Sequence, residues 1–553
     1  MRVVGSVLAR TAAQEVGLRR SPWIDVALLA IVIALTALYA FFYVDFSLPP
    51  AEDAAMLMRY AGHLATGGGM VWNTGEAPVD GATDFLFVIV VAGFHRFGLS
   101  LEHAVLVPTV AAHFAMVALI YAGLRYQGAA GLVAAATALY VALGPGLVIS
   151  AAYFGATFFA LVLALAWLLG QRLVLRGRRR WSDCLYFALT ALVAALVRPE
   201  GFVMALFMTV GFCATLPWRT ALRLALVVAV VFFLLGGVYF LWRWHYFGHP
   251  LPNPLYRRGR WTFDPREWAI LREHAINLGL PFLVASALAL ASPRSWRLAI
   301  GFAIPLVGFA IVWGLFSNAQ NFAGRYQYPL LPLAALSWYP PMSTLVRDIG
   351  LAKVYEALKW ARAGASLLAV VGVAALLIMQ LDASRRIGRD RDGKYEMGML
   401  LEQYANRSYS LATSEAGLLP LYSRWRTLDT WGLNDAKIAL RGRLTEEDLE
   451  RYHPAIVMWH DHGSLVTPPA EYRVGPWADM VTTLQRYVDA RGFVLAADFG
   501  IQPDDTHYYW VAPDIPECEE LVTAIRALPY AWLEGGAQAK DFAAGLPGRT
   551  CGS

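Results

Sequence analysis

The sequence predicts a polytopic α-helical membrane protein with a soluble α/β domain at its C-terminus, on the outer face. Hydrophobic residues make up 58% of the 553-residue chain and charged residues only 16%, whereas charged residues are about a quarter of an ordinary soluble domain. Apolar runs of roughly 20 residues, the length that crosses a bilayer, recur as far as Asp382 and then stop. Beyond Asp382 the chain is charged, aromatic and polar.

The arginines between the apolar runs set the expected topology, because Lys and Arg are enriched in cytoplasmic loops. Four arginines precede the first run and place the N-terminus in the cytoplasm. The run Phe85–Phe94 is too short to cross and is expected to be an interfacial or re-entrant helix, which leaves the basic run 176–180 inside. About eleven spans are expected, at Trp23–Val44, Val105–Tyr121, Gly131–Ile149, Phe158–Val174, Leu185–Leu196, Phe202–Leu216, Ala221–Phe240, Leu278–Ala291, Leu298–Leu315, Tyr328–Tyr339 and Ser366–Leu381.

Three parts are therefore expected along the chain. Residues 1–22 form a cytoplasmic segment, 23–382 a transmembrane domain and 383–553 an α/β domain on the outer face. The basic clusters lie between apolar spans, so binding to nucleic acid is not expected.

The C-terminal part alternates strand-like and helix-like patterns. A helical pattern runs over Trp477–Ala490, and turn signals separate the short β-like runs. Cys518 and Cys551 can form a disulfide if this part is exported. The β-like runs are Ala455–Trp459, Phe493–Ala497 and Tyr508–Ala512.

The first loop outside the membrane carries the most informative pattern. Glu52-Asp53 follows the first span, Ala54–Ala65 has the pattern of an amphipathic helix on the membrane surface, and Gly67-Gly68-Gly69 ends that helix. Carboxylates at a membrane suggest function and can activate a hydroxyl as a nucleophile. The alternative is a solvated loop in which one of the acids caps the helix. Polar and aromatic neighbours favour a sugar-binding cleft: Arg59, Tyr60, Trp72, Asn73, Glu76, Asp80, Thr83 and Asp84.

Other outward turns supply cations and aromatic residues at the membrane edge. Cations at this depth suit a lipid phosphate. The alternatives are snorkelling arginines and, in the turn Arg198–Gly201, a local salt bridge. The candidates for substrate binding in these turns are Arg198, Glu200, His245, Asn253, Tyr256, Arg258, Arg325 and Tyr326.

This set of features resembles the GT-C glycosyltransferases, integral membrane enzymes that take sugars from polyprenyl-phosphate donors. Within that superfamily the segment 52–84, EDAAMLMRYAGHLATGGGMVWNTGEAPVDGATD, is similar to the mycobacterial cell-wall arabinofuranosyltransferases that add terminal arabinose. The same branch is matched by Arg198–Gly201, by Pro252-Asn253 with Tyr256, by Gly324-Arg325-Tyr326 with Pro329 and Pro332, and by Thr427–Asp435 (TLDTWGLND).

The resemblance implies a GT-C-like catalytic domain and an inverting transfer. The branch usually has two aspartates after the first helix, so the general-base role is carried to Asp53, with Glu52 as a partner. Arg258 or Arg325 would hold the leaving phosphate. The branch often has an acid in the second external loop, but here that loop reads Gly155-Ala156-Thr157; we therefore expect no metal site built on it and no required cofactor.

The implied co-substrate is a polyprenyl-phosphate sugar, possibly carrying arabinofuranose. The acceptor would be a polysaccharide, a glycolipid or a glycoprotein. The implied location is the bacterial inner membrane, with the active site and the C-terminal domain on the periplasmic side and membrane lipid as a partner. Two alternatives stay open at this point: a transporter or flippase of lipid-linked sugars, and a non-catalytic receptor or assembly factor.

Overall fold

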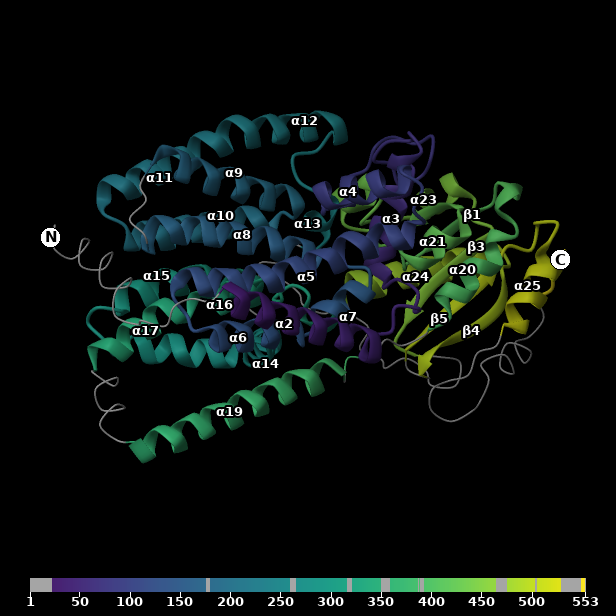
Figure 1. The fold of residues 1–553 in the computed structure, drawn as a ribbon. Coiled ribbons are helices and arrows are strands. Elements are labelled where there is room, and N and C mark those ends of the chain that lie inside the picture. The colour runs from purple at the N-terminus through teal and green to yellow at the C-terminus, as the bar shows by residue number, and fades with distance from the viewer. Residues whose placement is uncertain are drawn as a thin grey trace.

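In the computed structural model a helical domain and a mixed α/β domain lie end to end (Figure 1). The last described residues, 549–552, lie in the α/β domain, where Cys551 is bonded to Cys518. The structure describes residues 22–175, 180–258, 265–315, 321–349, 359–385, 387, 392–463, 475–502, 505–528 and 549–552.

Six stretches of helix in the described residues are long and apolar enough to cross a membrane: Pro22–Tyr43, Leu101–Gln127, Gly131–Ala151, Ala156–Leu175, Trp218–Phe247 and Trp296–Trp313. The helices of this domain, apart from α3, are α2 (Pro22–Tyr43), α4 (Phe85–Arg96), α5 (Leu101–Gln127), α6 (Gly131–Ala142), α7 (Gly146–Ala151), α8 (Ala156–Leu175), α9 (Trp181–Val197), α10 (Glu200–Thr215), α11 (Trp218–Val231), the π-helical turn η1 (Phe232–Gly236), α12 (Gly237–Phe247), α13 (Asn253–Arg258), α14 (Pro265–Ala289), α15 (Trp296–Trp313), the 3₁₀ turn η2 (Phe322–Gly324), α16 (Leu330–Ser337), α17 (Tyr339–Asp348) and α19 (Lys359–Arg385).

A proline explains where the expected span Gly131–Ile149 is divided, and two others lie just after the expected span Tyr328–Tyr339. Pro145 lies between α6 and α7, and α17 starts directly after α16 with Pro340 and Pro341 in its first turn. Proline lacks the N–H that an internal helical position must donate, whereas it is tolerated in a first helical turn. α19 runs along the side of the bundle and leads into the α/β domain (Figure 1).

Helix α3 (Glu52–Ala65) lies where the two domains meet (Figure 1). Small and apolar side chains cover one side of it and are buried, among them Ala54, Ala55 and Met58. The helix ends before Gly67, whose φ of +88° requires glycine. The helix expected over 54–65 is therefore present, but it is packed against helices of the bundle and against α21 (Leu418–Ser423) of the α/β domain.

The α/β domain is built on one five-stranded sheet. The strand order is β2-β1-β3-β5-β4; β2, β1 and β3 are parallel, and β5 is antiparallel to both β3 and β4. The disulfide Cys518–Cys551, which the sequence left open, is formed. The elements are α20 (Lys394–Glu402), η3 (Ala405–Arg407), β1 (Ser410–Thr413), α21 (Leu418–Ser423), β2 (Arg426–Asp429), α22 (Ala436–Arg441), α23 (Glu446–Tyr452), β3 (Ile456–Asp461), α24 (Pro476–Ala490), β4 (Val494–Gln502), β5 (Asp505–Val511) and α25 (Cys518–Ala527).

Candidate functional site

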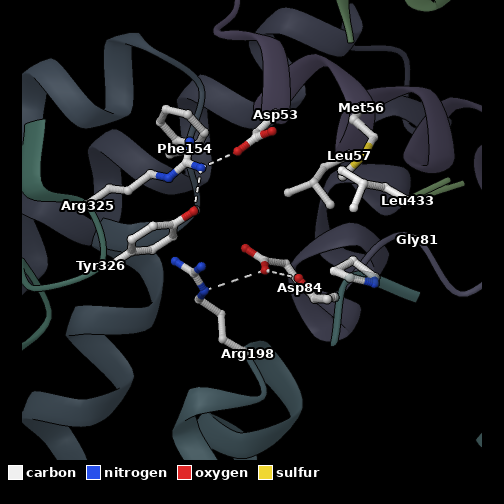
Figure 2. A pocket seen from close by; sticks show the side chains of 13 residues that line it. Asp53, Met56, Leu57, Gly81, Asp84, Phe154, Arg198, Arg325, Tyr326 and Leu433 are labelled. Atoms are coloured by element: carbon white, nitrogen blue, oxygen red, sulfur yellow. Dashed lines mark hydrogen bonds and ion pairs between the residues drawn. The ribbon is translucent and has the colours of Figure 1, made fainter. Parts of the chain in front are cut away.

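A pocket lies at the junction of the two domains and has about 530 Å³ of empty space, part of it open to solvent. Figure 2 shows two carboxylates in the pocket: Asp53 lies beside Arg325, and Asp84 is bonded to Arg198. The lining residues are Asp53, Met56, Leu57, Gly81, Thr83, Asp84, Phe154, Gly155, Arg198, Pro254, Arg325, Tyr326 and Leu433.

Asp53 reaches the pocket from the first turn of α3. The residue that precedes the helix is Ala51, which has no side chain able to cap it. Asp53 instead forms an ion pair with Arg325, and 25% of its side chain stays exposed. The expected alternative of a simple helix cap is thus not what this carboxylate does.

Arg325 is fixed by its backbone and by two aromatic rings. It follows η2, where Ala323 and Gly324 both have positive φ (53° and 68°), so the chain turns sharply just before it. Its guanidinium lies 3.9 Å from the ring centre of Phe154 and 4.9 Å from that of Tyr326, and it donates a 2.9 Å hydrogen bond to the Tyr326 hydroxyl. Cation–π contacts of this kind stabilise by about 0.5–2 kcal/mol each.

Arg198 comes from the tight turn between α9 and α10. Pro199 disfavours helical dihedrals in the residue before it, and Arg198 is extended, with φ −147° and ψ 145°. The guanidinium lies 3.2 Å from Glu200 and 3.5 Å from Asp84. Burial by itself lowers the pKa of Arg198, but Asp84 and Glu200 outweigh burial and raise it above the usual value, so this guanidinium keeps its charge. Arg198 therefore forms the local salt bridge with Glu200 and also lines the pocket.

Glu52 points away from the pocket, toward the α/β domain. Its carboxylate accepts hydrogen bonds from the backbone N–H groups of Gly417 and Leu418, and the Lys394 ammonium lies 3.6 Å away. Gly417 is required here, because a Cβ at this position would collide with the carbonyl of Glu52. Burial raises the pKa of Glu52 to about 7, and Lys394 offsets part of that rise.

The polar side chains expected to bind sugar in the first loop mainly join that loop to the α/β domain. Arg59 donates to the carbonyls of Trp72, Pro420 and Trp425, and Trp72 is only 2% exposed. The other contacts between the loop and this domain are Tyr60 to Asn434, Trp72 and Asn73 to Thr427, and Glu76 to Arg426 and Tyr452. Since their hydrogen bonds are used in this way, none of Arg59, Tyr60, Trp72, Asn73 and Glu76 lines the pocket.

The remaining predicted residues separate into two groups. Thr83, Asp84, Arg198, Arg325 and Tyr326 line the pocket, and Glu200 pairs with Arg198. Away from it, Asp80 pairs with Arg243, His245 is exposed, Tyr256 is 37% exposed, and the Arg258 side chain lies outside the described residues. Asn253 is fully buried next to the lining residue Pro254, and its amide has no hydrogen-bond partner among the described residues.

Phe154 and Leu433 are pocket residues that the sequence argument missed. Phe154 lies in the outward turn between α7 and α8, which was noted only for its lack of an acid. Leu433 belongs to the segment TLDTWGLND, so the α/β domain itself contributes to the pocket. That segment was recognised as a motif, but its place at the pocket depends on how the two domains dock.

The fold joins a helical domain, whose described residues include six stretches long and apolar enough to cross a membrane, to a C-terminal α/β domain. The particular likenesses are to two solved proteins. The apo structure of ArnT from Cupriavidus metallidurans is 15% identical and has a TM-score of 0.51, with 88% of this chain and 98% of ArnT covered. The apo oligosaccharyltransferase of Archaeoglobus fulgidus is 12% identical with a TM-score of 0.52, covering 90% of this chain and 75% of that protein. The same values are found for this oligosaccharyltransferase tethered to an acceptor peptide containing the NVT sequon.

These likenesses confirm the fold class expected from the sequence. Residues 383–511 match a family described as Domain of unknown function (DUF8728), which lies within the α/β domain. No curated protein matches the chain.

Proposed function

We propose that this chain is a membrane glycosyltransferase that moves one sugar from a polyprenyl-phosphate donor to a hydroxyl of an acceptor glycan. The reaction inverts the anomeric centre and takes place at the outer face of the bacterial inner membrane, where the α/β domain also lies. The resemblance of segment 52–84 to arabinofuranosyltransferases makes arabinofuranose the sugar to test first. The acceptor is a polysaccharide, a glycolipid or a glycoprotein.

The observation that carries this proposal is that one pocket brings Asp53 together with two guanidiniums, Arg198 and Arg325. A second carboxylate in the pocket, Asp84, pairs with Arg198. Asp53 reaches the pocket from the surface helix, and Arg198 and Arg325 reach it from two turns at the end of the helical bundle. An inverting displacement needs a base on the acceptor side of the sugar and positive charge on the leaving-group side. Guanidinium groups bind phosphate through charge-assisted hydrogen bonds, and here a phosphate would share Arg198 with Asp84 and Glu200.

The ion pair between Asp53 and Arg325 suggests how donor binding prepares the base. A carboxylate held by a guanidinium is a poor proton acceptor, because the guanidinium occupies its lone pairs. A phosphate that enters beside Arg198 competes for Arg325 and releases an oxygen of Asp53. Asp53 then accepts the acceptor proton as the hydroxyl oxygen bonds to the anomeric carbon and the bond from that carbon to the phosphate oxygen breaks.

The phosphate leaves as polyprenyl phosphate, with its growing negative charge opposite Arg198 and Arg325. Tyr326 and Phe154 hold Arg325 in place, so little reorganisation is needed during the reaction. Leu433 brings the α/β domain to the rim of the same pocket, which gives that domain a position from which to guide the acceptor. This arrangement favours the enzyme over a transporter, which needs no base beside the phosphate site.

Release of free polyprenyl phosphate tests the proposal. Purified protein is incubated with polyprenyl-phosphate arabinofuranose and an arabinan oligosaccharide, and with hexose donors in parallel. Acceptor-dependent release of polyprenyl phosphate, with the acceptor gaining one sugar, is the expected result. Movement of intact donor across a proteoliposome membrane with no release would contradict it and would favour the transporter.

A further inference from the structure

Three side chains that can bind a metal lie side by side at one end of the strands of the sheet: Glu415, His460 and His507. His460 on β3 is directly opposite His507 on β5 in the strand register, and paired residues of adjacent strands lie on the same face. Thr413 of β1 pairs with Met458 of β3. Two residues further along each chain, the same register places Glu415 beside His460. Ligand atoms of Glu415, His460 and His507 lie within 4.8 Å of one another.

The hydrogen bonds of the two histidines suit a metal site. The Nδ1 atom of His460 lies 3.6 Å from the Glu415 carboxylate, while its Nε2 atom is bound to Asp505. A metal-binding histidine almost always donates its other ring N–H to a carboxylate, a backbone carbonyl or water, which fixes the ring and its tautomer. His507 is 3% exposed, and its Nδ1 atom has no hydrogen-bond partner among the described residues. A buried imidazole nitrogen without a partner normally costs stability.

The charges around these three side chains also lack a cation. Lys394 lies 2.9 Å from Asp392, 3.4 Å from Glu415 and 3.6 Å from Glu52. Three carboxylates therefore share one ammonium group, and a fourth, Asp505, is bonded to His460. Lys394 also donates a hydrogen bond to Glu415, so a divalent cation bound by Glu415 would take the place of the lysine at that carboxylate and leave Lys394 paired with Asp392 and Glu52.

We propose that Glu415, His460 and His507 form a zinc-class metal site in the α/β domain. Two imidazoles and one carboxylate favour Zn²⁺ over Mg²⁺ or Ca²⁺, which prefer oxygen ligands. His460 binds through Nδ1, Asp505 positions it through Nε2, and a fourth position stays open for water or for the nearby His462. This site is separate from the pocket and does not depend on the transfer reaction proposed above.

A metal at this site would link β3 and β5 to the segment that follows β1. Through Lys394 this link would reach α3. Glu415 contacts Lys394, which contacts Glu52, the residue before Asp53. The metal therefore has a structural role in holding the α/β domain against α3. Its effect on the pocket would be indirect, through the position of that helix.

The test measures metal content in the purified full-length protein. Chelator-treated protein is equilibrated with Zn²⁺, desalted and analysed by mass spectrometry for metal, alongside His460→Asn, His507→Asn and the control His453→Asn. His453 is an exposed histidine that precedes β3 at its other end, with φ +45°, a conformation that asparagine tolerates. We expect one Zn²⁺ per chain in the wild type and the control, loss in the two ligand variants, and affinity about 10–100-fold weaker in Asp505→Asn.

A second measurement keeps the proposal testable if a ligand variant fails to fold. Co²⁺ added to the wild type should give the intense visible bands of a four-coordinate site, and Zn²⁺ should displace them. Absence of both Zn²⁺ retention and Co²⁺ bands in the wild type would overturn the proposal. Retention of Zn²⁺ by well-folded His460→Asn and His507→Asn at the level of His453→Asn would overturn it as well.

Discussion

Replacing Lys394 by methionine tests how the α/β domain is held on the surface helix. The Lys394 side chain is only 8% exposed and pairs with Asp392, Glu415 and Glu52, each from a different segment. Methionine keeps most of the volume of lysine and removes the charge. Three carboxylates are then left together without their cation.

The size of the effect follows from the burial of the group. Removing one partner of a buried ion pair costs about 3–5 kcal/mol, because an uncompensated charge remains. The cost should lie near the lower limit, since Glu52, with a pKa of about 7, takes up a proton once Lys394 no longer lowers that value. A loss of about 3 kcal/mol lowers the Tm of a domain of this size by roughly 6–12 °C.

The assay is thermal unfolding of the detergent-solubilised protein in EDTA, with limited proteolysis to follow the α/β domain separately. Lys437→Met is the matched control, because Lys437 is exposed on α22 of the same domain; surface changes of this kind are usually within about 0.5 kcal/mol. If Lys394→Met and Lys437→Met unfold at the same temperature, the account of this interface is wrong.

Three further predictions concern the same interface and the pocket. Burial raises the pKa of Glu52 from its ordinary value to about 7, so between these two values the folded protein holds a proton that the unfolded chain releases. The free energy of unfolding should therefore fall as pH rises from about 4.5 to 7, by up to about 3 kcal/mol. Glu52→Gln should flatten that slope in thermal melts, and an unchanged slope would contradict the assignment. Arg325→Lys should weaken donor binding by about 10–100-fold through loss of the forked, stacked guanidinium, and equal donor affinity in titration calorimetry would exclude Arg325 from the phosphate site. Gly417→Ala should destabilise the α/β domain by about 1–3 kcal/mol, because the added Cβ would meet the Glu52 carbonyl. Gly93→Ala should not, because a Cβ at Gly93 has no atom within 4 Å. Equal proteolysis rates of the two variants would count against this contact.

Features set by local pattern could be predicted from the sequence. The apolar runs predict most of the long helices. The pattern of small and apolar residues over 54–65, together with the glycines that follow, predicts α3. Arg325 was chosen as a phosphate-binding candidate from its position at the edge of a span, and the structure places it beside Asp53. That role stays a proposal, as does the general-base role of Asp53.

Features set by docking of the two domains could not be predicted. A loop pattern does not show which side will meet a domain several hundred residues later, so Arg59, Trp72 and Asn73 were expected to bind sugar although their hydrogen bonds join the two domains. For the same reason Leu433 was missed. The position of His460 beside His507 depends on sheet register, which two separated strand-like runs do not reveal.

The most direct test of the central claim is single-turnover transfer by Asp53→Asn at saturating donor, with donor binding measured on the same sample. Asp45→Asn is the control, because Asp45 is exposed after α2 and outside the pocket. If Asp53 is the general base, its replacement should slow transfer by about 10²–10⁴-fold while donor binding is kept, and Asp45→Asn should behave as the wild type. Transfer by Asp53→Asn at the wild-type rate would contradict the claim.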